Sequence, residues 1–239
     1  LNEATQKTSD LTATTTAITT FMTATTPDDL KAYDLTFMLE NANLTQLDES
    51  KQLIGWVNEG ATVAPNEDGI IEIDAKAGSF NLYQTLAKMP KGVYGMTTQG
   101  FERPGTLYAA NKAYSAGENN VSTNMYLRSE TFRQTIKHIM MDAQPEEVGV
   151  GQERSSNSGY VPNNMAAVVG YFAKGLYNNL MAMQMTVKTD MKVGIRNPGI
   201  MNNSMIMFTA PRLYYYGDKV TPEEVTSVAA PEGVTVEGS

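Results

Sequence analysis

The sequence predicts a mainly β protein: an antiparallel β-sandwich with two helical insertions and an N-terminal extension. Three observations lead to this prediction. Short segments in which apolar and polar residues alternate recur along the middle of the chain, as in strands with one buried face. Gly, Pro, Asn and Asp separate these segments at turn positions. With 239 residues, of which 41% are hydrophobic, the chain can bury a substantial core.

Charge and composition narrow the classes of function. The chain carries 18 basic and 26 acidic residues, a net charge of −8. An acidic chain without a basic stripe is a poor candidate for binding nucleic acid or anionic membranes, whereas neutral sugars remain possible ligands. No apolar run reaches the roughly 18 residues that a membrane helix needs, so membrane insertion is not expected. The absence of cysteine excludes disulfides and thiolate chemistry.

Residues 1–33 form the first predicted unit, a threonine-rich extension. The spacing of Leu11, Ile18 and Phe21 fits one face of a loose helix, so the extension is expected to be partly helical. A glycosylated threonine-rich stalk is the alternative. Residues 27–29 (Pro-Asp-Asp) have the composition of a helix start, because Pro is tolerated in a first helical turn and acids favour its positive dipole end.

Residues 34–217 form the second predicted unit, the sandwich itself. Its clearest feature is a hairpin over 79–101, in which the turn 89–92 places Pro second and Gly fourth. Residues 183–195 alternate between apolar and polar as a second antiparallel pair would. Trp56, in a short apolar run, is expected in the core. The other strands are expected at 35–39, 54–57, 70–74, 106–112, 121–128, 180–189, 191–197 and 207–217.

Two segments have the period of helices. The first, 129–144, starts with Ser129 as an N-cap and places its only histidine, His138, at a partly exposed position. The second, 161–179, has Asn163 or Asn164 as its cap. A loop rich in Gly, Ser and Asn, 146–164, leads from one to the other. After Gly217, the third predicted unit, 218–239, is a linker or tail.

The order of these segments resembles that of a known family. The segment NLYQTLAKMPKGVYGMTTQGFERPG (81–105) is followed by TLYAANK, KHIMMDAQ, YVPNNMAAVVGYFAKGLYNN and FTAPRLYYYG. Over about 34–217 they resemble galactose-binding-like jelly rolls, the architecture of many carbohydrate-binding modules. Similar modules occur in exported proteins and glycoside hydrolases of gut bacteria. The resemblance implies a jelly-roll fold, carbohydrate as the partner and a secreted or cell-surface location beside other modules of one polypeptide.

The chain departs from the family pattern in two places. The first strand leads into Asn41-Ala42-Asn43-Leu44, where the family has Asn-Pro-x-Phe-Glu. The last strand lacks the family's Asp and contains Pro211, which cannot donate to a sheet ladder, so we expect a break, a bulge or an edge there. Oxygen ligands from Asn41, Asn43 and Asp48 could hold a structural calcium ion. A polar loop explains the same residues without a metal, and no other cofactor is indicated.

Sugar binding requires an aromatic face and polar side chains on a rigid platform. Phe101 and Arg103, at the end of a hairpin strand, are candidates, together with Tyr160, Asn163 and Asn164 from the long loop. For each aromatic residue, core packing is the alternative role.

The sequence contains few residue patterns that indicate a catalytic site. A single histidine gives no argument for a Ser-His-Asp arrangement. Adjacent acids such as Glu146-Glu147 have diverging side chains, unlike the two carboxylates of a glycosidase. The sequence therefore predicts a non-catalytic carbohydrate-binding module. A structural or adhesive spacer domain that binds no sugar is the first alternative, and a glycan-processing enzyme is the second.

Overall fold

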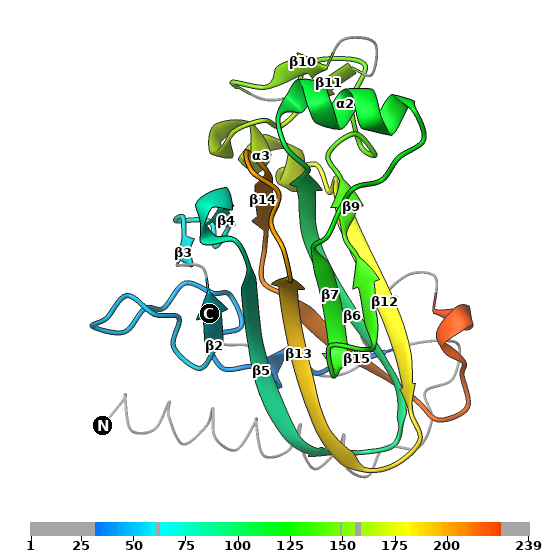
Figure 1. Ribbon diagram of the computed structural model, residues 1–239. Helices are drawn as coiled ribbons and strands as arrows, with labels where there is room; N and C mark the ends of the chain where they lie inside the picture. The colour runs from blue at the N-terminus through cyan, green and yellow to red at the C-terminus, as the bar shows by residue number, and fades with distance from the viewer. Residues whose placement is uncertain (1–31, 61–62, 149, 156–158, 226–239) are drawn as a thin grey trace.

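Two antiparallel sheets packed face to face form the protein (Figure 1). The structure is a computed structural model that describes residues 32–60, 63–148, 150–155 and 159–225. The mainly β, sandwich architecture predicted from the sequence is therefore confirmed. The predicted N-terminal helix, including 27–29, and the end of the predicted tail lie outside the described residues.

The smaller sheet has five strands. In spatial order they are β2 (Val57–Gly60), β5 (Phe80–Met89), β13 (Thr189–Asn197), β7 (Asn124–Arg128) and β8 (Arg133–Thr135).

The larger sheet has eight strands and is organised around β6 (Gly92–Arg103). Antiparallel partners follow each other along both edges of this long strand, and only β9 runs parallel to it. The other strands are β1 (Tyr33–Asp34), β3 (Ala64–Pro65), β4 (Ile71–Asp74), β9 (Lys137–His138), β12 (Asn178–Met185), β14 (Met205–Phe208) and β15 (Arg212–Gly217).

The remaining elements are helices, a short hairpin and 3-10 turns, and the helices and the hairpin lie at one end of β6 (Figure 1). They are the helices α2 (Leu107–Ser115) and α3 (Met165–Ala173), the hairpin β10 (Glu153–Ser155) and β11 (Gly159–Val161), and the 3-10 turns η1 (Thr36–Met38), η2 (Ala75–Ala77) and η3 (Pro222–Glu224). Among the described residues, no helix is long and apolar enough to cross a membrane.

The strongest sequence signals gave correct local structure. The hairpin β5–β6 turns where predicted, and Tyr94 Oη fixes the turn by donating to the Pro90 carbonyl at 2.8 Å. The break at Pro211 is confirmed, because β14 ends at Phe208 and β15 begins at Arg212. Trp56 is buried as predicted.

Side-chain alternation fills two separate cores. Met183, Val193 and Ile195 point between the sheets, where they form the main core. The three consecutive tyrosines of β15 alternate: Tyr215 joins that core, and its neighbours pack on the opposite face. A second core lies between β6, β14 and the helices, at the end of the sandwich that carries the candidate site.

Four predicted elements are wrong. The strand expected at 54–57 is a turn at its start, and β2 begins only at Val57. Residues 107–115 form α2 instead of a strand, because the Thr106 side chain accepts from the Ala109 amide and caps a helix. Residues 129–144 form β8, β9 and turns instead of a helix. Their apolar residues divide between two cores, with Ile136 in the first and Ile139 in the second. The apolar residues that are spaced as on one helix face therefore pack against two different surfaces. Residues 35–39 contain a 3-10 turn instead of a strand.

His138 is buried on β9 and not partly exposed as predicted. Its ring stacks on Tyr114 with centroids 4.8 Å apart, and its Nδ1 accepts from the Met140 amide at 3.1 Å. Burial lowers the pKa of His138 to about 4.

The pKa of His138 leads to a first prediction. The unfolded chain takes up a proton near pH 6.5, whereas the folded protein keeps the imidazole neutral until about pH 4. Folding stability is therefore expected to fall as the pH drops from 6.5 to 4. NMR of the single histidine should show a midpoint below pH 5 in the native protein and near 6.5 in urea. A native midpoint near 6.5 would contradict the buried, neutral ring.

Candidate functional site

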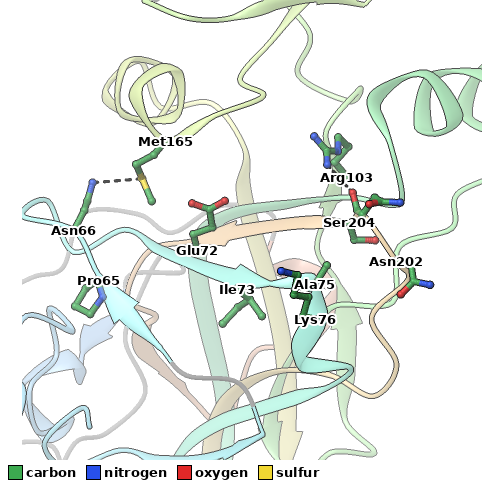
Figure 2. A pocket seen from close by; sticks show the side chains of 11 residues that line it. Pro65, Asn66, Glu72, Ile73, Ala75, Lys76, Arg103, Met165, Asn202 and Ser204 are labelled. Atoms are coloured by element: carbon green, nitrogen blue, oxygen red, sulfur yellow. Dashed lines mark hydrogen bonds between the residues drawn. The ribbon is translucent and has the colours of Figure 1, made fainter. Parts of the chain in front are cut away.

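A polar groove with a volume of about 970 Å³ lies beside the second core. It is formed where β4, the end of β6, the start of α3 and the loop between β13 and β14 meet (Figure 2). Its lining residues are Pro65, Asn66, Glu72, Ile73, Ala75, Lys76, Arg103, Met165, Asn202, Asn203 and Ser204.

Arg103 is the best-positioned charged group of the groove. Its Nε donates to the Gly105 carbonyl at 2.9 Å, one terminal nitrogen donates to the Asn203 carbonyl at 2.6 Å, and the other donates to Asn163 Oδ1. Burial lowers the pKa of Arg103, and the nearby carboxylates of Glu153 and Glu72 act in the opposite direction. A guanidinium has five N–H donors and stays charged, so two donors remain for a ligand.

The strand that carries Arg103 is anchored from its other face. The neighbouring Glu102 is buried and accepts from the amides of Ser122 and Thr123 at 2.9 and 2.7 Å, and from the Thr123 hydroxyl at 2.7 Å. Burial raises the pKa of Glu102, and these hydrogen bonds oppose that rise. They join β6 to the start of β7, which makes the platform under the groove rigid.

The opposite wall of the groove is built by Asn66. Its Oδ1 accepts from the amides of Asp68 and Ile70 at 3.0 and 2.8 Å, which closes the turn between β3 and β4. Its Nδ2 points to the sulfur of Met165 at 3.5 Å, a weak contact that joins this turn to α3 (Figure 2). Glu72 is exposed, and its carboxylate lies between the two walls in the same view.

The structure brings together two of the residues predicted for ligand binding and gives two others different roles. Arg103 and Asn163 are hydrogen-bonded, and Asn163 Nδ2 also donates to Glu153 at 2.8 Å. Asn164 is the cap of α3, since its Oδ1 accepts from the Ala167 amide at 3.0 Å. Tyr160 lies on β11 beneath the Arg154 guanidinium, 5.8 Å from its carbon, and is not a lining residue of the groove.

The predicted role of Phe101 in ligand binding requires a correction. Its side chain is 0% exposed and packs in the second core against Phe172 and Tyr177. The ring has no free face, so it cannot stack on a sugar. The alternation of β6 explains this, because Phe101 points toward the helices while the next residue, Glu102, points to the other side.

The residues predicted for calcium take part in a loop. The Asn41 side chain donates to the Gln46 carbonyl at 2.9 Å and accepts from the Thr45 and Gln46 amides, both at 3.0 Å. Asp48 Oδ1 accepts from two amides two and four residues ahead. Asn43 lines a separate depression beside Glu67 and Asp68. No group of three or more His, Asp or Glu side chains able to hold a metal occurs within the described residues. Calcium binding stays a prediction.

Sequence reasoning missed most of the groove. Asn66, Glu72, Lys76, Asn202 and Ser204 come from three separate stretches of chain and share no motif. The one local signal was the polar run 202–204, which follows Pro198 and Gly199 and is typical of an exposed loop. Its position beside Arg103 depends on the pairing of β14 with β6.

No protein-family model matches the chain, and no curated protein matches it. Among solved structures, the chain is similar to the carbohydrate recognition domain of Emp47p, with a TM-score of 0.34 and 9% sequence identity over 80% of this chain and 99% of that one. A similarity this low carries no information about the ligand of this chain.

Proposed function

We propose that this protein is a non-catalytic carbohydrate-binding module and that the groove is its sugar site. The observation that carries the proposal is the convergence of fixed polar groups on one groove. The Arg103 guanidinium is held by three hydrogen bonds, and the Asn66 amide is held by the turn that it closes. A few positioned polar groups in a concave site give a ligand its orientation.

The groove also offers apolar surface for the C–H faces of a sugar ring. Met165 and Pro65 line it between the polar groups (Figure 2). No aromatic ring is among its described lining residues, so stacking on Met and Pro takes the place of the aromatic platform that the sequence predicted.

The non-catalytic part of the proposal follows from the carboxylates. Glycoside hydrolysis uses two carboxyl groups, roughly 5 to 10 Å apart, on either side of the scissile bond. Among the described residues that line the groove, Glu72 is the one carboxylate. The resemblance of 34–217 to modules of exported gut-bacterial proteins supports a place in a secreted or surface-attached polypeptide.

Asn202→Ala tests the site. Asn202 is exposed in the groove, so its removal should leave the stability unchanged. Loss of one hydrogen bond to a sugar hydroxyl should weaken binding about 3- to 10-fold. A glycan array identifies the ligand, and titration calorimetry then compares wild type, Asn202→Ala and Glu72→Gln.

Asn119→Ala is the matched control, because Asn119 is equally exposed and lies in the loop after α2, outside the groove lining. Binding that is unaffected by both groove substitutions would show that the groove is not the site. An array without any specific hit would favour the alternative of a structural spacer.

A further inference from the structure

A cluster of three cations lies on the outer face of the five-stranded sheet. We define this basic face as Arg128 on β7, Arg133 on β8 and Lys192 on β13. Lys192 lies directly opposite Arg128 in the strand register, and Arg133 lies opposite Tyr126. The inward residues that alternate with them, such as Leu127 and Val193, belong to the main core, so the three cations share the outer face.

None of the three cations is bonded to a carboxylate of the described residues, although the carboxylates of Glu59 and Glu130 lie nearby, bonded to Tyr83 and Arg196. The Lys192 ammonium lies 4.0 Å from the centre of the Tyr83 ring, and the Arg128 guanidinium lies 5.3 Å from that of Phe132. Arg133 donates to the Glu130 carbonyl at 3.2 Å. In the described part of the chain, no ion pair within 4 Å includes any of the three, whereas the neighbouring Arg196 is paired with Glu130.

Two features of this face are unfavourable for folding. Like charges directly opposite each other on neighbouring strands destabilise a sheet, and Lys192 faces Arg128 in this way. Arg128 also has a φ of +65°, a left-handed conformation that suits Gly or Asn better than Arg. The local positive charge of this face is complementary to an anionic partner, even though the chain as a whole has a net charge of −8.

We propose that the basic face binds an acidic polysaccharide, one that carries carboxylate or sulfate groups. Adjacent strands lie about 4.8 Å apart, so Lys192 and Arg128 are separated by roughly one sugar ring. Arg133 is offset from Arg128 by two residues along the strands, so its distance from Arg128 is larger. Duplex DNA carries one charge per about 1.7 Å of its helix axis, counted over both strands, so a dense basic stripe is needed to match it. Three cations also fall short of the 6–10 phosphate contacts typical of tight nucleic-acid binding.

The surface is open in the described structure. Helices α2 and α3 pack at the end of β6 and not across β5, β13 and β7, as Figure 1 shows. Phe132 is 42% exposed at the edge of the face and can contact a sugar ring. The basic face and the groove share no residue, so this inference does not depend on sugar binding in the groove.

The test compares two double variants with the same change in net charge. The first, Arg128→Asn with Lys192→Gln, removes two cations of the basic face, and Asn is tolerated at a positive φ, so the fold is expected to survive. The second, Lys112→Gln with Lys174→Gln, removes two exposed cations that lie on α2 and just after α3. Thermal unfolding of each variant confirms that it is folded.

Binding is measured by affinity electrophoresis and calorimetry with polygalacturonate, chondroitin sulfate, dextran and a single-stranded oligonucleotide. We expect the wild type to bind one or both acidic polysaccharides but not dextran, with binding that weakens as salt is raised. The face variant should bind at least tenfold more weakly, and the helix variant should bind like the wild type.

Four outcomes would overturn the proposal. Equal weakening by both double variants would show an unspecific charge effect. Equal or tighter binding of the oligonucleotide would assign the face to phosphate polymers. Loss of acidic-polysaccharide binding in Asn202→Ala, with full binding in the face variant, would place that binding in the groove instead. The absence of binding to either acidic polysaccharide would exclude the proposed partner, and the proposed function of the groove would be unaffected.

Discussion

Replacement of Phe101 by alanine is expected to lower the free energy of unfolding by about 3–5 kcal/mol, the usual cost of removing a buried phenyl ring. The ring is 0% exposed, and its centroid lies 4.7 Å from that of Tyr177 and 6.3 Å from that of Phe172. Its loss would leave a cavity in the second core, beneath the end of β6 that carries Arg103. Urea unfolding followed by fluorescence or circular dichroism measures the change.

Phe132→Ala provides the matched control for this prediction. Phe132 is 42% exposed, and its main contact is the Arg128 guanidinium at 5.3 Å, so its loss should cost about 1 kcal/mol or less. Similar losses for the two variants would contradict the burial of Phe101. For the folded fraction of Phe101→Ala, the free energy of glycan binding should change less than the free energy of unfolding, because the buried ring contacts no ligand.

Replacement of Gly194 by alanine should destabilise the protein by about 3 kcal/mol. Gly194 lies at the centre of β13, opposite Tyr126 on β7. A Cβ atom at this position would lie 2.5 Å from Tyr126 Cζ and 2.6 Å from its hydroxyl. The ring would have to move, and the hydrogen bond that Tyr126 donates to Asn81 Oδ1 at 2.7 Å would be lost in a buried site.

Gly199→Ala is the control for the Gly194 prediction, since an added Cβ at Gly199 meets nothing within 4 Å and its φ is not in the left-handed region. We expect a change within about 0.5 kcal/mol. Chemical unfolding of both variants measures their free energies of unfolding. Equal values for Gly194→Ala and the wild type would mean that the Tyr126 ring does not lie over Gly194.

The predicted site shows that residues close together in the sequence can take different roles in the folded protein. Arg103, at the end of a hairpin strand, and Asn163, in the long loop, were both predicted to bind the ligand, and the structure joins them by a hydrogen bond across 60 positions of sequence. Phe101, only two residues from Arg103, turned out to be a core residue. The pairing of β6 with β14 is regular through Arg103, so Phe101 and Arg103 share a face of the strand. That face is covered by the second core at Phe101 and borders the groove at Arg103.

The basic face illustrates a second limit of sequence reasoning. The chain has no run of basic residues, and its net charge of −8 argues against an anionic partner. Yet Arg128 and Lys192, 64 positions apart, are neighbours across two strands. Charge counted along a chain misses a cluster that strand pairing assembles.

The sequence by itself determined the features that depend on neighbouring residues. These are the β class, the turn at 89–92, a helix cap at Asn163 or Asn164, an irregularity at Pro211 and the alternating core of β12 and β13. Turn geometry, helix capping and the two-residue period of strands act over a few residues and can be read directly. The tertiary structure decided the burial of His138 and Phe101, the strand conformation within 129–144, the groove and the basic face. Each of these depends on which distant strand lies alongside, because burial and charge complementarity arise only where separate segments pack together.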